Sequence, residues 1–399
     1  MIEPTSLYIH IPFCISKCAY CDFFSRAGNK SLSDDYISAL CNEISFRIKN
    51  KTVSELQTIY IGGGTPSLLS KNQFQKIFSH IRSLVKLGAD AEITVEVNPD
   101  DVSKDLLDAL AEGGVNRISC GIQSMNDKAL KRACRRADEA VNFKALSLLK
   151  EFWQGDVSVD LISGLPEDDE RGVVRSLKTV CEINPAHISL YSLTIEEETP
   201  FGKQLESGVL NYDFDVADKL WLMGRDYLEK AGYKWYEVSN FCKPGKECRH
   251  NLAYWTHKGY LGCGSGGTGT VYSEDGSGAR WTNTQKIEDY IDFWKGLSDF
   301  ESLNNFDLKK VQVEETIDLQ TSEFEFFMMS LRKLSGFYES EYIQIFGKNI
   351  PETIIKRFEE WQKKGLCEIK KVSDRNNDIQ YSMTREGMLF LNRFLEELV

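Results

Sequence analysis

Three cysteines within eight residues carry the strongest chemical signal in the chain. Cys14, Cys18 and Cys21 follow the spacing C-x3-C-x2-C, which brings three thiolates together on one short loop. Iron–sulfur clusters are held by cysteine thiolates, usually four to a [4Fe–4S] cluster. With three protein ligands, one iron is left open to bind a small molecule. The spacing therefore predicts a [4Fe–4S] cluster with one open iron.

Two other readings of this loop remain. Structural zinc needs four closed ligands, commonly two C-x2-4-C pairs, and no second pair lies nearby. The cysteines could also be incidental buried thiols. However, the loop directly follows the apolar, strand-like run 7–11 and Pro12. We therefore favour the cluster.

The elements that must position this loop alternate regularly through the first half of the chain. Strand-like runs occur at 7–11, 58–61, 92–97, 117–122, 157–162 and 187–190, and stretches with helical spacing at 34–48, 73–85, 104–112, 139–149 and 172–183. Repeated strand–helix alternation predicts an α/β fold with a parallel sheet. Six units are too few for a closed eight-stranded barrel, so we expect a partial, three-quarter βα barrel.

The second half of the chain does not continue this regular strand–helix alternation. We expect a barrel domain over 1–205, an extension over 206–300 and a small winged-helix-like domain over 301–399. The extension should hold a helix at 216–230 and a strand at 234–238, followed by glycine-rich turns through Gly278. In the last part we expect helices at 323–334 and 351–364, a hairpin formed by 365–369 and 379–383, and a closing helix over 385–398. A plain helical cap is the alternative.

Chemistry-bearing residues fall where the predicted strands end. Gly62–Thr65 follow the second strand, Glu96 ends the third, Gln123 follows the fourth and Asp160 lies on the fifth. Because parallel strands bring their carboxyl ends to one rim, these residues should meet around one site. Consecutive glycines allow close approach of a ligand to the backbone, although a glycine run alone would be only a turn. A carboxylate inside an apolar run, such as Asp160, needs either a ligand or a structural partner.

Three segments together resemble a known family. They are Tyr8–Cys14 with the cysteine triplet, Gly62–Ser67 and the hexad His250–Trp255. This combination is similar to the radical S-adenosylmethionine (SAM) proteins related to oxygen-independent coproporphyrinogen III oxidase, and more narrowly to the HemW-type haem chaperones. The resemblance extends from about residue 6 to the C-terminus. It implies the same three-quarter barrel.

The resemblance also implies roles for individual residues. SAM would chelate the open iron, and one electron from the reduced cluster would cleave it. Residues expected to bind or line the SAM site are Tyr8, His10, Tyr20, Gly63, Gly64, Thr65, Glu96, Gln123, Arg135 and Asp160. Arg135 is chosen over the adjacent Arg136 on spacing from Gln123, and an arginine fork suits a carboxylate. For Tyr8 and His10, burial with ordinary hydrogen bonds is the alternative.

The chaperone and oxidase branches differ at several positions. The oxidases carry a further cysteine two residues after the third ligand, where this chain has Phe23, and an N-terminal extension for which fourteen residues leave no room. In the chaperone reading, His250 is a candidate axial haem ligand. An ordered loop is one alternative, and a zinc site of Cys242, Cys248, His250 and His257 is another. Thr268 stands where relatives carry a histidine, so haem binding would be weaker or use another ligand.

The composition narrows the function classes further. Among 399 residues the net charge is −12, which argues against a nucleic-acid-binding surface. We find no transmembrane run and no signal peptide, and eleven scattered cysteines do not form a disulfide framework, so a cytoplasmic location is expected. The predicted function is haem delivery to an acceptor protein, with flavodoxin or an NAD(P)H-linked donor as reductant. The alternative is oxidative decarboxylation of coproporphyrinogen III.

Overall fold

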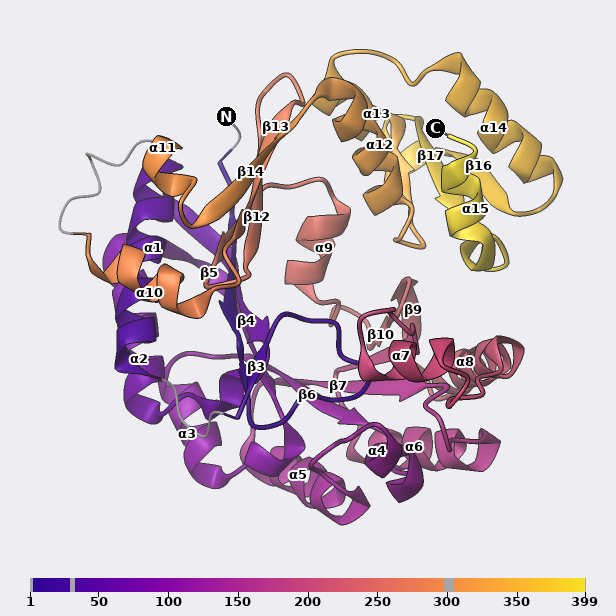
Figure 1. Cartoon of the computed structure of the whole chain (residues 1–399). Coiled ribbons are helices and arrows are strands. Elements are labelled where there is room, and N and C mark those ends of the chain that lie inside the picture. Colours follow the sequence, from indigo (N-terminus) through magenta and orange to yellow (C-terminus); the bar gives the residue numbers. More distant parts are fainter. Residues whose placement is uncertain (1–2, 29–32, 298–304, 399) are drawn as a thin grey trace.

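One large sheet dominates the computed structural model, which describes residues 3–28, 33–297 and 305–398. Within these residues the sheet has twelve strands, in the order β14-β13-β12-β11-β1-β4-β5-β6-β7-β8-β10-β9 (Figure 1). Two smaller sheets accompany it, β15-β17-β16 and β2-β3. No helix in the described part of the chain is long and apolar enough to cross a membrane.

Six neighbouring strands in the middle of this sheet run parallel. They are β1 (Ser6–Ile11), β4 (Glu55–Gly63), β5 (Lys86–Val97), β6 (Arg117–Gln123), β7 (Asp156–Ser163) and β8 (His187–Ser192). Each contains one of the predicted strands, so the six-unit α/β arrangement is confirmed.

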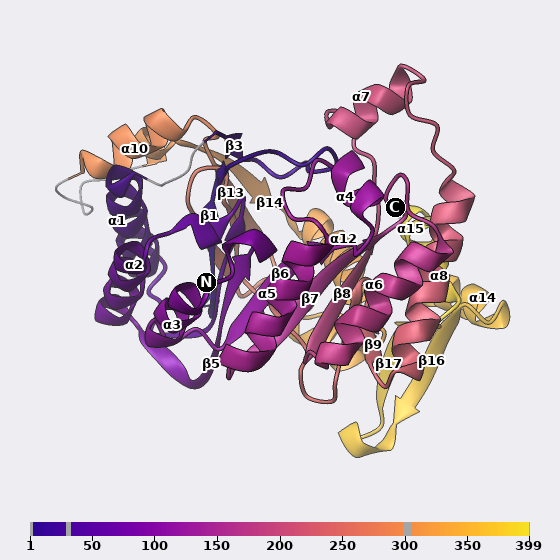
Figure 2. The same cartoon turned by 90° about the horizontal axis from the view of Figure 1, so that it is seen from below.

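Helices connect these strands and cover one face of the sheet, as Figure 2 shows for α3, α5 and α6. They are α1 (Asp34–Asn50), α2 (Lys71–Leu84), α3 (Lys104–Glu112), the short α4 (Asp127–Arg132), α5 (Glu139–Phe152) and α6 (Glu170–Ile183). The longer ones begin after a serine or aspartate whose side chain accepts a hydrogen bond from the first turn, as Ser70 and Asp138 do. Such caps satisfy backbone N–H groups that the helix leaves free. Two 3-10 turns, η1 (Pro66–Leu68) and η2 (Pro99–Asp101), follow β4 and β5.

The two faces of the parallel strands differ in chemistry. On β1, Leu7, Ile9 and Ile11 are fully buried in the apolar core. Tyr8 and His10 alternate with them, and the register sets Tyr8 beside Tyr60 of β4. Since side chains alternate along a strand, the sheet packs an aliphatic face against the helices and turns a polar, aromatic face inward. This inner face carries the site.

Further strands, most of them antiparallel to their neighbours, extend the sheet at both edges. On one side β11 (Tyr260–Cys263) pairs in parallel with β1 and is followed by β12 (Thr268–Tyr272), β13 (Gly278–Asn283) and β14 (Gln312–Ile317); on the other side β10 (Asn240–Cys242) and β9 (Lys234–Glu237) follow β8. The expected strand at 234–238 is confirmed as β9. The region expected to be glycine-rich turns through Gly278 has turns at 264–266 and 274–276, but it also contains the strands β11 and β12, which were not predicted. A Cβ on Gly262 would lie 1.9 Å from the carbonyl oxygen of Thr268, and one on Gly269 would lie 2.2 Å from the Trp281 ring. These glycines permit close strand packing.

Between β8 and β14 the described residues form five more helices. They are α7 (Pro200–Glu206), α8 (Phe214–Lys230), α9 (Arg249–Trp255), α10 (Ile287–Lys295) and α11 (Asn305–Leu308). The helix expected at 216–230 is confirmed as α8. The hexad forms α9, which Figure 1 draws between the sheet and the C-terminal elements.

The C-terminal part combines helices with a three-stranded sheet. Its elements are α12 (Leu319–Ser330), β15 (Phe337–Tyr338), α13 (Glu339–Phe346), α14 (Glu352–Lys363), β16 (Cys367–Val372), η3 (Ser373–Arg375), β17 (Asp378–Met383), η4 (Gly387–Phe390) and α15 (Leu391–Glu396). The hairpin β16–β17 is confirmed, but the closing helix expected over 385–398 is only a 3-10 turn followed by the short α15. The domain boundaries at 205 and 300 stay predictions; β14, which lies after the second boundary, pairs along its length with β13.

Candidate SAM and cluster site

The cysteine loop is fixed to the rim of the sheet by its backbone. It runs between β2 (Phe13–Cys14) and β3 (Arg26–Ala27), which pair with each other. At its middle, Ala19 donates its N–H to the Ala133 carbonyl at 3.0 Å and accepts from the Phe201 N–H at 2.9 Å. The loop is therefore anchored between α4 and α7.

A cavity of about 430 Å³ opens beside this loop. All three cysteines line it, together with eight of the eleven residues expected at the SAM and haem sites: Tyr20, Gly63, Gly64, Thr65, Glu96, Gln123, Arg135 and Asp160. The other three, Tyr8, His10 and His250, are not on its wall. The cavity thus gathers the ends of β4, β5, β6, β7 and β8 beside the cysteine loop.

Two side chains in the cavity donate hydrogen bonds to cysteine sulfurs. The Thr65 hydroxyl lies 3.4 Å from Cys14 Sγ, and Arg135 Nη1 lies 3.5 Å from Cys18 Sγ. A cysteine sulfur that binds a metal carries negative charge, which such donors and the Arg135 guanidinium can stabilise. Arg135 Nη2 also donates to the Gly121 carbonyl at 2.6 Å, while its buried Nε has no partner. The loop and its neighbours therefore fit anionic cysteine sulfurs.

Arg136 points to different partners. It pairs with Asp100 and, at 3.0 Å, with Asp101. Arg136 is thus paired with carboxylates of the chain itself, whereas Arg135 lines the cavity and has a buried Nε without a hydrogen-bond partner. The role of Arg135 in binding SAM stays a prediction.

The glycine run at the end of β4 lets the chain pass between β1 and β5. Gly63 has a φ of +112° and donates its N–H to Glu96 Oε2 at 3.1 Å. A Cβ on Gly64 would lie 2.7 Å from the Phe13 carbonyl oxygen and 2.8 Å from the Phe13 nitrogen. Any side chain at Gly64 would push into the backbone that leads to Cys14.

Two buried carboxyl groups lie at the inner end of the cavity. Burial raises the pKa of Glu96 to about 7, against hydrogen bonds from Tyr60 and Gly63 that lower it, while the nearby Asp160 raises it further. Burial likewise raises the pKa of Asp160, which accepts a hydrogen bond from Ser119 at 2.8 Å. No basic side chain neutralises Glu96 directly among the described contacts. A cationic or hydrogen-bond-donating ligand would stabilise its charged form.

Tyr8 and His10 have partners within the protein. The Tyr8 hydroxyl lies 2.8 Å from His10 Nδ1, and His10 Nε2 lies 2.9 Å from the Phe24 carbonyl. A carbonyl only accepts, so Nε2 carries the proton and Tyr8 donates to Nδ1. Burial lowers the pKa of His10, which agrees with a neutral ring. In this arrangement Tyr8 supports the cysteine loop through His10 and Phe24, and its expected contact with SAM stays a prediction.

His250 is likewise engaged inside the protein. Its side chain is 1% exposed, its Nδ1 lies 2.7 Å from the Thr58 hydroxyl, and its Nε2 lies 2.8 Å from the Tyr254 hydroxyl. Burial lowers its pKa to about 3. In this arrangement neither ring nitrogen is free for a haem iron. The Thr268 hydroxyl is also engaged, 3.0 Å from the Thr282 hydroxyl.

The zinc alternative finds no support in the geometry. His257 bonds to Ser322 at 3.0 Å and stacks on Tyr272, and Cys248 lies against Glu92. No three His, Cys, Asp or Glu side chains among the described residues are grouped as one metal ion requires. In a [4Fe–4S] cluster each thiolate binds a different iron, so the cysteine triplet need not meet this criterion.

Several wall residues were not predicted from sequence. Asn98 donates to the Thr65 hydroxyl at 3.2 Å and accepts from Arg135 at 3.4 Å, and Tyr191 lies at the end of β8. Phe23 is 70% exposed at the edge of the cavity. The two-residue strand period could have indicated Tyr191, which shares a face with Ser189.

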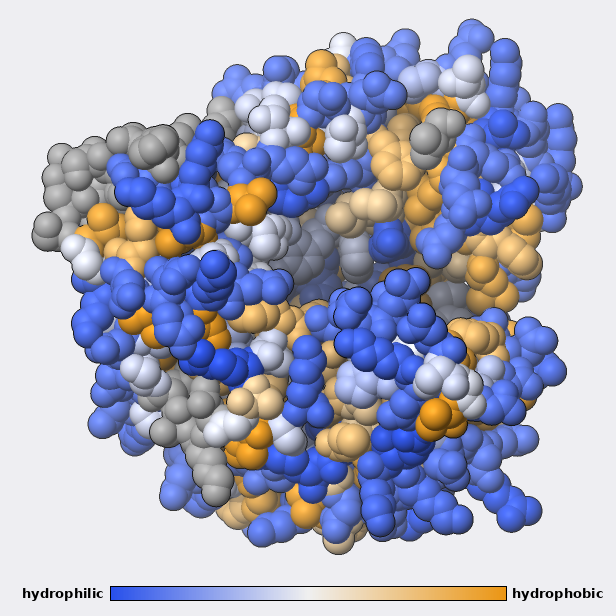
Figure 3. Space-filling model, viewed as in Figure 1, coloured by the Kyte–Doolittle hydropathy of each residue, from blue (hydrophilic) through white to orange (hydrophobic). Residues whose placement is uncertain are grey.

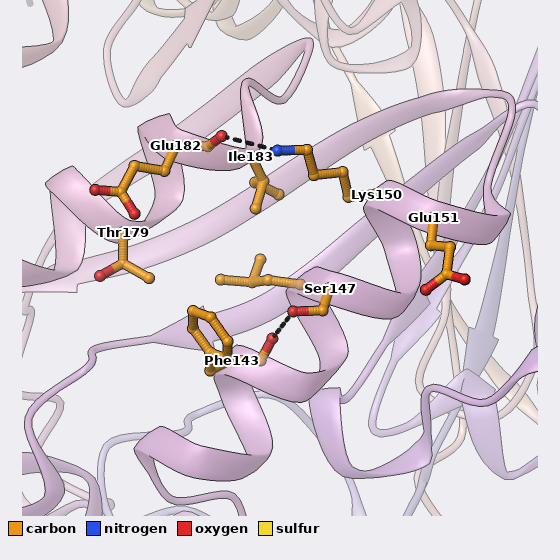
Figure 4. Close-up of a pocket in the computed structure, with 8 residues that line it drawn as sticks. Phe143, Ser147, Lys150, Glu151, Thr179, Glu182 and Ile183 are labelled. Carbon is orange, nitrogen blue, oxygen red and sulfur yellow. Dashed lines mark hydrogen bonds between the residues drawn. The ribbon is translucent and has the colours of Figure 1, made fainter.

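A second hollow, of about 330 Å³, lies between α5 and α6 on the outer face (Figure 4). Its polar groups are used locally: Lys150 donates to the Glu182 carbonyl at 3.3 Å and Ser147 to the Phe143 carbonyl at 2.9 Å. Nothing there resembles a reactive group of side chains.

Known proteins are similar to this chain over most of its length. Residues 8–180 match the family model described as the Radical SAM superfamily. A protein of Escherichia coli (strain K12) named Heme chaperone HemW is 36% identical over 397 residues, covering 99% of this chain and 98% of its own length. A protein of the same name from Bacillus subtilis (strain 168) is 32% identical, covering 98% and 100%.

A solved structure shares the fold over nearly the whole chain. It is titled as the coproporphyrinogen III oxidase HemN of Escherichia coli, a radical SAM enzyme, with a TM-score of 0.80, 22% identity, and coverage of 99% of this chain and 90% of that one. The family resemblance inferred from the three motifs is thus confirmed. By its similarity over nearly its full length, this chain belongs to the family of the Heme chaperone HemW proteins within the radical SAM superfamily.

Proposed function

We propose that this chain is a haem chaperone, which binds haem and delivers it to an acceptor protein. The observation that carries the proposal is the near-complete length over which it matches relatives named Heme chaperone HemW. Membership of the radical SAM superfamily implies a [4Fe–4S] cluster and SAM. When bound, the cluster supplies the electron that cleaves SAM.

Roles for the chain's own residues follow from the cavity. Cys14, Cys18 and Cys21 would hold the cluster, with Thr65 and Arg135 stabilising charge on two of the sulfurs. The SAM residues would be Gly63, Gly64, Glu96, Gln123 and Asp160, with Tyr20 beside the cluster. We do not assign the haem ligand to His250, since both of its ring nitrogens are engaged.

The oxidase alternative has less support. At the position where the resemblance places the oxidases' further cysteine, this chain presents the exposed ring of Phe23. The HemN-like fold does not favour the oxidase, because a likeness at 22% identity shows the fold alone. A flavodoxin or NAD(P)H-linked reductant and a cytoplasmic location stay predictions.

The experiment is haem transfer measured on anaerobically reconstituted protein. Reconstitution should give about four irons per chain, and alanine in place of any loop cysteine should abolish the cluster. Buried Cys41 and Cys367 are the matched controls, whose alanine variants should keep it. We expect haem to bind and to move to an apo-haemoprotein acceptor. Decarboxylation of coproporphyrinogen III with SAM and a reductant, without haem binding, would instead establish the oxidase.

A further inference from the structure

The hexad helix α9 closes the inner end of the polar face, where it is clamped by two buried side chains of the sheet. Glu92 of β5 accepts the backbone N–H groups of Arg249 and His250 at 3.1 and 2.9 Å. Arg117 of β6 donates to Glu92 at 3.0 Å and to the Lys246 carbonyl at 3.1 Å. Figure 3 shows this side of the molecule hollowed at its centre, in the area where Figure 1 draws α9. These hydrogen bonds therefore fix the position of α9 against β5 and β6.

His250 projects from α9 onto the aromatic ring next to the cavity. Its imidazole stacks on Tyr60 with a centroid distance of 5.2 Å and an interplanar angle of 28°. Thr58 and Tyr254 hold the two ring nitrogens, which fixes the rotation of the imidazole. Tyr60 also stacks on Tyr8, with a centroid distance of 6.2 Å. Two ring contacts, with His250 and Tyr8, therefore set the position of the Tyr60 ring.

The hydroxyl of Tyr60 then reaches the cavity wall. It donates to Glu96 Oε1 at 2.9 Å, and Glu96 Oε2 accepts the Gly63 N–H at 3.1 Å. Both Glu96 and Gly63 line the cavity, whereas His250 and Tyr60 do not. A continuous set of contacts therefore leads from the His250 imidazole through Tyr60 to the carboxylate of Glu96, which lines the cavity.

We propose that His250 is a positioning residue for the SAM cavity, which fixes the Tyr60 ring and thereby the Glu96 carboxylate, and that it is not a haem ligand. Removing the imidazole would free the Tyr60 ring on one flank and loosen the hydrogen bond to Glu96. The inference depends on SAM binding in this cavity and not on haem delivery, so it can fail while the proposed function stands.

The test measures the dissociation constant of SAM and the haem spectrum on the same reconstituted protein. His250→Ala and Tyr60→Phe should each weaken SAM binding by about tenfold, the size expected for losing a well-oriented hydrogen bond to a carboxylate. In a Glu96→Gln background, the effect of His250→Ala should fall to about twofold or less, because coupled residues are not additive. The Soret band of bound haem should keep its position in His250→Ala.

Two further variants keep the test decisive. Tyr254→Phe removes one hydrogen-bond partner of the imidazole with little change in shape, and it should also weaken SAM binding. This variant serves as the test if His250→Ala does not fold. His257→Ala is the matched control, since His257 is also buried but contacts Ser322 and Tyr272 rather than Tyr60. The proposal is overturned if SAM affinity is unchanged in the His250 and Tyr254 variants, if the loss is equal in the Glu96→Gln background, or if the Soret band shifts while SAM still binds normally.

Discussion

Glu96→Gln gives the sharpest test of the electrostatics of the cavity. The folded protein raises the pKa of Glu96 from an ordinary value of 4.5 to about 7, mainly by burial. Between these two values the folded chain keeps a proton that the unfolded chain has lost, so stability falls as the pH rises through this window. The difference in pKa corresponds to at most ~3 kcal/mol, less whatever water in the cavity screens.

The glutamine variant lacks this titration. Its free energy of unfolding relative to wild type should therefore rise from pH 4.5 to pH 8 by about 2–3 kcal/mol. A pH-independent cost is expected as well, because the new amide must place its NH2 near either the Tyr60 hydroxyl or the Gly63 N–H. The slope with pH, rather than the stability at one pH, is the quantity that tests the reasoning.

Urea unfolding of cluster-free wild type and variant, at several pH values, measures this slope. Glu206→Gln serves as the control, since Glu206 is an exposed carboxylate at the end of α7. The control should run parallel to wild type. A pH-independent difference between Glu96→Gln and wild type would refute the buried, proton-holding carboxyl.

Two further predictions concern the loop and the arginine pair. Gly63→Ala should destabilise the protein clearly more than Gly245→Ala, as measured by urea unfolding. Both glycines have positive φ, but a Cβ on Gly63 would lie 2.6 Å from the His10 ring, whereas a Cβ on Gly245 would meet open space. Arg135→Lys should weaken SAM binding by about tenfold, because a point charge replaces a planar fork, while Arg136→Lys should leave it within about twofold of wild type; equilibrium dialysis with labelled SAM distinguishes them, and the reverse ranking would contradict the assignment.

The parallel core of the fold could be predicted because its signal is local. Each strand of β1 and β4 to β8 is a short apolar run, and each connecting helix has a capping residue and an amphipathic pattern. The strands β11 to β13 lack that signal. Their glycines are required by neighbours far along the chain, such as Trp281 against Gly269, and this close packing cannot be seen in the local sequence.

Part of the candidate site could likewise be predicted from the sequence, and part could not. Cysteine spacing and strand ends indicated the residues that line the cavity, because parallel strands bring their ends to one rim. The hexad did not indicate that His250 is buried, because its partners are Tyr254 and, 192 residues earlier, Thr58. Burial of a histidine depends on which strand its helix meets. That contact is set by the clamp of Glu92 and Arg117 and not by the motif.

The polar inner face explains why so many of these groups depend on one another. In a closed βα barrel the interior is filled with branched apolar side chains, but here Tyr60, Glu96 and Asp160 project inward without such filling. Each buried polar group must find a partner or cost free energy. Tyr60 supplies one for Glu96, and Ser119 supplies one for Asp160. In this arrangement the pKa of Glu96 is about 7. The charged form of Glu96 is therefore stabilised most by a ligand that brings positive charge or hydrogen-bond donors, as the sulfonium and amine of SAM do.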